Sequence, residues 1–285
     1  GITSLDSQGS ASGGGGSSKG GLTIGTANFT ENQVLGYLYA AVLKQAGVKV
    51  KVRPNLGTRE IVIPALRGGD IDLLPEYQGA LLNYLAPKDD SSEPGTMQNA
   101  LTLAMPAGLQ VLPYGQAADS DCFVVTRATA RKYGLATLAD LAEQNGRLVI
   151  GAAPEVKKRR VGALGLKDVY GVEFKEFRSL DSDGPLVKGA LKKGDVDVAN
   201  PFTTDTDIAA HDWVVLSDPK NLIPSQHIVP LIADRKADDT VRKALARLGN
   251  VLTTEQLTQL NSQVDNDTKD PEDVANAYAK QHGLA

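Results

Sequence analysis

The sequence predicts an α/β protein that consists of two similar lobes. From Leu22 onward, strand-like apolar runs alternate with helical patterns, and this alternation is typical of βαβ units built around parallel strands. The alternation restarts after Cys122, and one helix–Gly-Asp–strand junction occurs twice. A chain of 285 residues with 41% hydrophobic residues can form the cores of two ordinary domains.

The elements follow one another in a regular order along the chain. In the first half, three strands are each followed by a helix: strands at residues 22–25, 48–53 and 71–74, and helices at residues 31–46, 58–67 and 78–85. After Cys122, strands are expected near residues 122–126, 147–151, 172–175, 196–199 and 212–216, with helices near residues 128–143 and 184–193. A strand at residues 228–233 precedes helices near residues 238–249, 253–264 and 271–281.

The repeated junction suggests an internal duplication. Residues 65–73 match residues 190–198 at an offset of 125, and the same offset places Tyr77 on Phe202. Residues 23–25 match residues 149–151 at an offset of 126. The junction is common enough to match by chance, but two blocks that agree in offset to one residue favour a duplication.

Charge and residue usage exclude several classes of protein. Thirty basic against thirty-four acidic residues give a net charge of −4, which argues against a surface that grips nucleic acid or anionic lipid. Cys122 is the single cysteine, so we expect no internal disulfide and no multi-cysteine metal site. The three histidines lack ligand-like spacing, and we expect neither a metal nor a cofactor. Uninterrupted apolar runs are too short for a membrane span.

Residues 1–21 have the composition of a flexible tether. Gly and Ser dominate this segment and large apolar side chains are rare, so little burial could offset the entropy of ordering it. Two interpretations stay open. The segment is a ragged terminus or cloning remnant, or it is the stalk of an exported protein whose signal or anchor lies upstream.

The duplication also predicts where a ligand would bind. Open α/β sheets place ligands at the carboxyl ends of their strands, and Tyr77 and Phe202 each follow the Asp-x-Asp strand of their repeat. We expect both rings in one cleft that closes on a small molecule by hinge motion; the alternative is that they are core aromatics. The expected lobes are residues 22–123 with 229–285, and residues 124–228.

Several ordered motifs resemble those of the glycine betaine/choline-binding proteins of osmoprotectant ABC importers. The likeness runs in order from about Leu22 to Ala285. It is carried by Ile24-Gly25-Thr26-Ala27-Asn28-Phe29-Thr30-Glu31, Gly69 to Gly79, Ala118-Asp119-Ser120-Asp121, Pro154-Glu155-Val156 with Arg159, and Gly194 to Val198 followed by Phe202-Thr203-Thr204-Asp205.

The resemblance implies a fold and a role. That family consists of extracytoplasmic proteins with a two-lobed, type II periplasmic-binding-protein fold, in which each lobe is a mainly parallel sheet flanked by helices. Its members deliver a small solute to an ABC permease, and many are attached to the membrane by a lipid anchor. We therefore expect a monomeric substrate-binding protein outside the cell membrane, with the permease and a small-molecule ligand as partners.

The resemblance also implies ligand-binding residues. A quaternary ammonium is held by aromatic faces, and Tyr77 occupies a cage position while Phe202 stands where the family usually has tyrosine. Arg159 matches an arginine that reads a ligand carboxylate, for which a guanidinium fork is suited; the alternative is a solvated basic run. Thr26, Gln78 and Thr204 lie in the matching motifs, and we expect them to bind the ligand as well.

Two positions depart from the family pattern. Asp121 stands where many members have an aromatic residue or asparagine, and Gln226 stands where a further tyrosine is common. Asp121 could offer its charge to a cation such as choline. Equally, Asp121 and Gln226 could bind the hydroxyls of a polar or phenolic ligand whose ring stacks on Tyr77 and Phe202.

The polar residues near the strand ends have structural interpretations too. Asp205 is expected to be a helix N-cap. Thr26, Asn28 and Thr30 could cap the first helix, which is the favoured interpretation, or present polar atoms to the ligand. An enzyme is not expected, because the sequence shows no catalytic motif or paired ligand set. Transferase chemistry on a cofactor-bearing cysteine would have to use Cys122. A sensor or binding module without a transport role is a third class.

Overall fold

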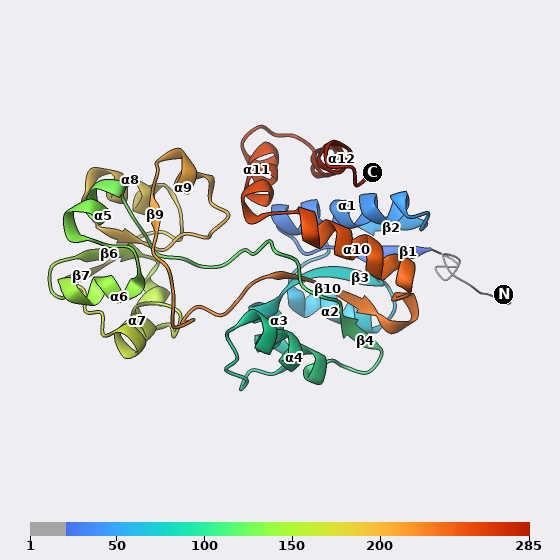
Figure 1. The fold of residues 1–285 in the computed structure, drawn as a ribbon, viewed down its shortest axis with the longest axis horizontal. Helices are drawn as coiled ribbons and strands as arrows, with labels where there is room; N and C mark the ends of the chain where they lie inside the picture. The colour runs from blue at the N-terminus through green and yellow to red at the C-terminus, as the bar shows by residue number, and fades with distance from the viewer. Residues whose placement is uncertain (1–20) are drawn as a thin grey trace, which may run out of the picture. The chain divides into compact units, whose positions relative to one another are not determined.

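The structure, a computed structural model, describes residues 21–285, and the tether expected at residues 1–21 lies almost wholly outside them. The described residues divide into two compact units, residues 21–118 with 226–285 and residues 119–225 (Figure 1). Each unit is a five-stranded sheet flanked by helices, which confirms the predicted fold class. The expected lobe boundaries, at residues 123/124 and 228/229, lie a few residues further along the chain.

Unit 1 is a mixed sheet with helices on both faces. Its strand order is β2-β1-β3-β10-β4, with β1, β2 and β3 parallel and β10 antiparallel to β3 and β4. Figure 1 shows α1, α10 and α12 on one face and α2, α3 and α4 on the other. The strands are β1 (Leu22–Gly25), β2 (Val50–Arg53), β3 (Leu73–Tyr77), β4 (Leu109–Val111) and β10 (Ile228–Ala233). The helices are α1 (Thr30–Gln45), α2 (Arg59–Arg67), α3 (Gln78–Leu85), α4 (Pro94–Ala104), α10 (Asp239–Val251), α11 (Thr254–Asp265) and α12 (Pro271–Gln281).

Unit 2 repeats the same plan with shorter elements. Its strand order is β7-β6-β8-β5-β9, so that β6 and β8 take the places of β1 and β3, and β5 runs antiparallel to β8. The strands are β5 (Val124–Val125), β6 (Val149–Ala152), β7 (Glu176–Ser179), β8 (Val198–Ala199) and β9 (Val214–Val215). The helices are α5 (Arg127–Tyr133), α6 (Leu138–Leu141), α7 (Ala163–Tyr170), α8 (Pro185–Lys193) and α9 (Thr206–Ala210).

The two copies of the repeated junction make matching hydrogen bonds. In unit 1 the Asp72 carboxylate accepts the Thr23 N–H at 2.8 Å, and in unit 2 the Asp197 carboxylate accepts the Val149 N–H at 2.9 Å. Each aspartate N–H returns to the carbonyl of the same partner, at 2.7 and 2.8 Å. One junction geometry is therefore built twice, because each Asp holds the start of the neighbouring strand.

Glycine occupies the same place in both copies. A Cβ on Gly25 would overlap Ile71 Cδ1, and a Cβ on Gly151 would lie 2.9 Å from Val196 Cγ1. Gly25 is the last residue of β1 and Gly151 the last but one of β6, and each lies beside the apolar residue of the Gly-Asp-Ile/Val-Asp junction. The small residue is required there because a side chain has no room.

Two expected elements are wrong. The strand expected at residues 172–175 is found at β7, because Gly171 ends α7 in the left-handed conformation (φ 71°) and Val172 folds back to donate its N–H to the Leu166 carbonyl. The single helix expected at residues 128–143 is two helices, because Gly134 (φ 65°) ends α5. The helices α4, α7 and α9 and the strand β4 were not predicted.

Within residues 21–285, no helix combines the length and apolar character that a membrane crossing requires.

Candidate functional site

A pocket of about 280 Å³ opens in unit 1 at the carboxyl ends of β1 and β3. The chain leaves β1 toward β2 on one side and returns to β3 on the other, so the pocket lies where the strand order reverses, the usual ligand position in open α/β sheets. The loops that precede α1 and α2 form its other walls. Its lining residues are Ala27, Asn28, Phe29, Asn32, Thr58, Arg59, Glu60, Val62, Leu74, Pro75, Glu76 and Tyr77.

Tyr77 lines this pocket and also belongs to the core of unit 1. Its side chain is 6% exposed, and its hydroxyl donates a 2.7 Å hydrogen bond to Glu31 Oε2. The other Glu31 oxygen accepts from Asn261 Nδ2 at 2.9 Å, which ties the site to α11. The Phe29 ring lies 6.0 Å from the Tyr77 ring and is 41% exposed. Two aromatic side chains thus meet at the pocket, the inner one fixed by a buried carboxylate.

An ion pair between Arg59 and Glu76 also lines the pocket. Arg59 donates from Nε and Nη2 to the two oxygens of Glu76, at 2.7 and 2.8 Å. Glu76 is 3% exposed and also accepts the Tyr77 N–H at 3.0 Å. This two-point contact is the strong form of an arginine–carboxylate pair, and it fixes the guanidinium plane beside the pocket.

Asn32 and the loop after β1 shape the pocket wall. Asn32 is 1% exposed, donates to the Pro75 carbonyl at 3.1 Å and accepts the Ala27 N–H at 2.8 Å. The expected capping of α1 by Thr26, Asn28 or Thr30 is wrong. The N-cap residue of α1 is Phe29, and among residues 21–285 no side chain makes a capping hydrogen bond to the start of this helix.

Three other predicted site residues of unit 1 hold backbone in place. Thr26 is fully buried and accepts the Asn55 N–H at 2.9 Å. Gln78, also fully buried, donates from Nε2 to the Pro94 carbonyl at 3.1 Å. Gln226 Oε1 accepts the Ala80 N–H at 3.0 Å, at the start of α3. None of the three is among the residues that line the pocket.

In unit 2, Phe202 and Asp121 are brought together by β-pairing. The two residues form an antiparallel bridge that continues the register of β5 and β8. Phe202 is 46% exposed. Burial raises the pKa of the Asp121 carboxyl, while the nearby positive charge of Arg159 acts in the opposite direction. Arg159 itself is exposed and ends a short 3₁₀ turn at Pro154–Lys158.

Acidic side chains surround the segment that follows Phe202. Asp205 is the N-cap of α9, as expected, and accepts the Asp207 N–H at 2.8 Å. Lys188 Nζ lies 2.9 Å from Asp205 and 2.7 Å from Asp207. Burial and the neighbouring Asp205 raise the pKa of Asp183 to about 8. Thr204 Oγ1 donates to Asp119 at 3.2 Å. This network fixes the loop that carries Phe202.

Cys122 does not have the surroundings of a reactive thiol. It is 5% exposed, its Sγ lies 3.5 Å from the Pro201 carbonyl, and burial raises the pKa of the thiol. A raised thiol pKa leaves little of the nucleophilic thiolate. Among residues 21–285, no group of three or more His, Cys, Asp or Glu is arranged to hold a metal ion.

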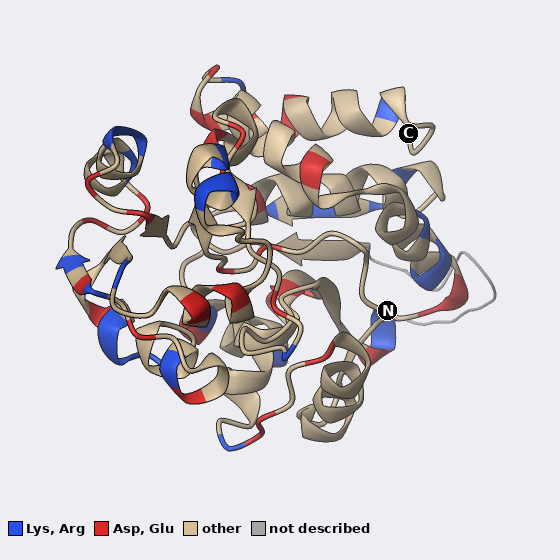
Figure 2. Ribbon diagram, turned by 60° about the vertical axis from the view of Figure 1, so that its left-hand side comes forward, with Lys and Arg blue, Asp and Glu red and all other residues tan. Residues whose placement is uncertain are grey.

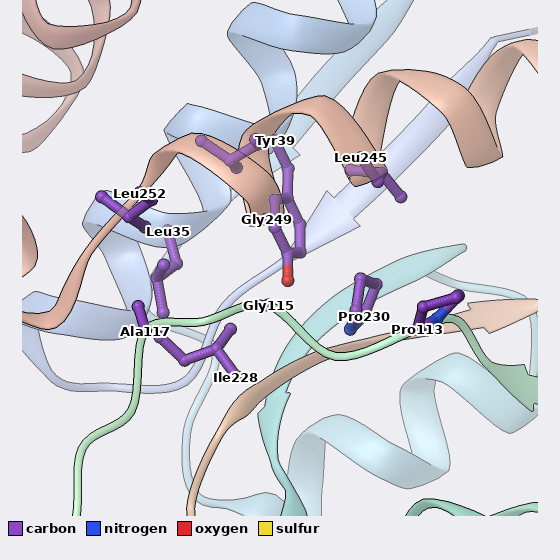
Figure 3. Close-up of a pocket in the computed structure, with 11 residues that line it drawn as sticks. Leu35, Tyr39, Pro113, Gly115, Ala117, Ile228, Pro230, Leu245, Gly249 and Leu252 are labelled. Atoms are coloured by element: carbon purple, nitrogen blue, oxygen red, sulfur yellow. The ribbon is translucent and has the colours of Figure 1, made fainter. Parts of the chain in front are cut away.

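A second, apolar pocket lies in unit 1 between α1, α10 and residues 113–117 (Figure 3). Its volume of about 20 Å³ is enough for a water molecule but not for an organic solute. Gly115 and Gly249 close it, because a Cβ on Gly115 would lie 3.1 Å from the Gly249 Cα. We therefore place the candidate site in the larger pocket.

Figure 2 shows Lys and Arg interspersed with Asp and Glu along the chain. The charge at the candidate site is therefore argued from the local contacts of its residues.

Sequence reasoning found some of the pocket but missed Phe29, Asn32, Arg59 and Glu76. Phe29 and Glu76 lie in the motifs that carry the family resemblance. In those motifs Thr26 and Tyr77 were chosen as site residues instead. Arg59 is at the start of α2, outside every motif. The sequence did contain a signal for Arg59. It follows the turn after β2, the strand beside β1, so it lies at the same end of the sheet as the pocket.

The comparisons with known proteins agree with this architecture. A family model described as the substrate binding domain of ABC-type glycine betaine transport system matches residues 20–281. The carnitine transport binding protein OpuCC of Listeria monocytogenes is 26% identical over 276 residues, which cover 94% of this chain and 89% of that protein. The glycine betaine-binding protein YehZ of Escherichia coli is 25% identical, with 92% and 90% covered.

A solved structure is similar over the same length. The crystal structure of a glycine betaine/carnitine/choline ABC transporter protein superposes with a TM-score of 0.83 at 26% identity, covering 92% of this chain and 99% of that one. The match of the family model over nearly the whole described chain agrees with the duplicated α/β units. This chain belongs to the family of substrate-binding domains of ABC-type glycine betaine transport systems.

Proposed function

We propose that this protein captures a small quaternary ammonium solute outside the cell membrane and delivers it to the permease of an ABC importer. The observation that carries the proposal is the family match over residues 20–281, joined to a duplicated fold that sets an aromatic residue after the equivalent strand of each unit. The relatives' names give carnitine and glycine betaine as the first solutes to test.

The proposed binding residues come from both units. Tyr77 and Phe202 would hold the methylated ammonium, since each aromatic face contributes about 0.5–2 kcal/mol to binding a cation. Asp121, bridged to Phe202, would add a negative charge for the same group. Arg159 is the residue that the family resemblance assigns to a ligand carboxylate. Thr26, Gln78, Gln226 and Thr204 would support the site through the hydrogen bonds described above.

A phenolic or polar ligand is the second candidate within the same fold. It is favoured by Asp121 and Gln226, whose side chains accept hydrogen bonds where family members often carry aromatic rings. A sensor without a transport role would bind the same solutes. Attachment to the outer face of the membrane through a lipid anchor is part of the proposal for either role. Transferase chemistry has no support from Cys122, whose thiol is buried.

A thermal-shift screen tests the proposed function. The purified chain is heated with glycine betaine, carnitine, choline, amino acids, polyols and simple phenols. Because a ligand that binds only the folded state raises the melting temperature, glycine betaine or carnitine should give the largest shift. A shift with phenols alone would favour the second candidate, and no shift with any quaternary ammonium would refute the first. Solute uptake by cells with and without the gene separates importer from sensor.

A further inference from the structure

In unit 2, three carboxyl groups meet one lysine beside the loop that carries Phe202. Lys188 of α8 has its Nζ 2.9 Å from Asp205 Oδ2 and 2.7 Å from Asp207 Oδ2. Asp183, in the loop before α8, lies 3.9 Å from the same Nζ. These contacts join α8 to α9, which Figure 1 shows next to each other. Because the three acidic side chains are only 6–32% exposed, ionising all of them against one lysine is unfavourable.

The side chains of Asp183 and Asp205 form a carboxyl pair. They are hydrogen bonded to each other, and two ionised carboxylates have no hydrogen to place between them. The buried Asp205 Oδ2 accepts no aligned hydrogen bond from the N–H and O–H donors of residues 21–285, which leaves it for the proton of Asp183. Burial and the hydrogen bond to Asp205 raise the pKa of Asp183 to about 8. Asp183 is therefore the donor of the pair at neutral pH.

The pair is tied directly to Phe202. The Asp205 N–H donates to the Phe202 carbonyl at 3.0 Å and closes a turn, so that a displacement of Asp205 also displaces Phe202. The Asp183 carboxyl accepts the Phe202 N–H as well. Asp183 thus holds the loop at two points, the backbone of Phe202 and the side chain of Asp205.

The charged and titratable groups that face the pair come from four segments of unit 2. They are Lys188 of α8, Asp207 of α9 with His211 Nε2 3.6 Å beyond it, Asp181 in the loop before α8, and Asp119, Asp121 and Cys122 before β5. Burial lowers the pKa of Lys188 and its aspartate partners raise it, with a net rise, and burial raises the pKa of the Cys122 thiol. Both groups therefore keep their protons up to pH 9. An ordinary histidine, with a pKa of about 6.5, is neutral above pH 7.5.

We propose that Asp183 is a positioning residue for Phe202 whose proton keeps the ring in the place where it meets the ligand. With the proton present, Asp183 bonds to Asp205 and the loop is fixed. Loss of the proton leaves two negative carboxylates side by side, which repel each other and loosen the turn. The inference rests on the proposed function and adds to it a fall in ligand affinity as pH rises. The ligand cannot cause this fall, because a quaternary ammonium has a fixed charge and a carboxylate is fully ionised at these pH values.

Titration calorimetry at pH 7.5 and 9.0 tests the inference, with whichever of glycine betaine and carnitine gives the larger thermal shift. If only the protonated form binds, its share falls from about three quarters to about one eleventh for a pKa of about 8, and the dissociation constant should rise by about eightfold. Circular dichroism at pH 9.0 checks that the chain stays folded. A dissociation constant that changes by less than about twofold in wild type would overturn the inference.

Asp183→Asn separates the proton from the rest of the side chain. The amide can donate to Asp205 and accept from Phe202 at every pH, and asparagine tolerates the φ of 53° found here. This variant should bind with the same affinity at pH 7.5 and 9.0. The matched control is Asp195→Asn, at an exposed position just beyond α8, which should keep the wild-type rise. A purely structural Asp183 would change the melting temperature and leave the pH profile of affinity unaltered, and that result would overturn the inference.

Proton uptake by wild type keeps the test valid if Asp183→Asn does not fold. Calorimetry at pH 8.0 in two buffers of different ionisation enthalpy should show uptake of about half a proton per bound ligand. Binding without proton uptake would overturn the inference and leave the proposed function standing. A wild-type chain that binds neither solute at pH 7.5 would refute the proposed function, and the inference with it.

Discussion

Tyr77 has a structural and a binding role that two substitutions should separate. Tyr77→Phe removes the 2.7 Å hydrogen bond to Glu31 and leaves the ring in place. A hydrogen bond to a charged group contributes about 1.5–3 kcal/mol to stability, so the free energy of unfolding should fall by about that amount. Tyr77→Leu loses the same hydrogen bond and also removes the aromatic face, which is worth a further ~0.5–2 kcal/mol of binding to a cationic solute.

Urea denaturation followed by circular dichroism gives the first quantity, and titration calorimetry with glycine betaine gives the second. We expect both variants to be less stable than wild type, and Tyr77→Leu to bind more weakly than Tyr77→Phe. Phe202→Leu is the matched control for stability. Because Phe202 is 46% exposed, this variant should unfold at nearly the same urea midpoint as wild type. Tyr77→Phe as stable as wild type would refute the structural role of the hydroxyl, and Tyr77→Leu binding as tightly as Tyr77→Phe would refute the binding role of the ring.

Four further substitutions test other parts of the structure. Gly25→Ala and Gly151→Ala should each destabilise the chain by about 1–3 kcal/mol in urea denaturation, because the added methyl group overpacks a strand end; two neutral outcomes would contradict the matched junctions. Asn32→Ala should lower both the stability and the ligand affinity, since it removes the side chain that links Ala27 to Pro75 of β3. An affinity unchanged in titration calorimetry would count against that role. Asp183 has a folded pKa of about 8, above its unfolded value, so its stabilising effect should be lost as pH rises from about 4 to 8. Asp183→Asn should flatten that decline in urea midpoints at pH 5, 7 and 9, and a parallel profile would argue against a raised pKa.

The duplicated plan of the fold could be predicted because its signals are local. The Gly-Asp-x-Asp junction uses the second aspartate to hold the neighbouring strand, at Asp72 and Asp197 alike, and that requirement leaves the same residues in both copies. The displaced strand β7 could not be placed in the same way. Val172 has strand-like character, but its N–H bonds back to the Leu166 carbonyl in the turn that ends α7, and this local helix cap overrides its strand propensity.

The candidate site was less accessible to sequence reasoning than the fold. Tyr77 could be singled out because it follows a repeated strand, yet its hydrogen bond to Glu31 spans 46 positions. Arg59 contacts Glu76 across 17 positions, and no periodicity connects a helix start to the end of a different strand. Pairings of this kind depend on the order of strands in the sheet, which a single sequence states only indirectly.

The central proposal is that a quaternary ammonium zwitterion binds to this chain with the participation of Tyr77 and Phe202. Titration calorimetry with glycine betaine on wild type, Tyr77→Leu, Phe202→Leu and the double variant tests it most directly. The account predicts one saturable site per chain in wild type and weaker binding in each single variant. The proposal would be contradicted if wild type showed no saturable binding, or if either Tyr77→Leu or Phe202→Leu bound glycine betaine with the affinity of wild type.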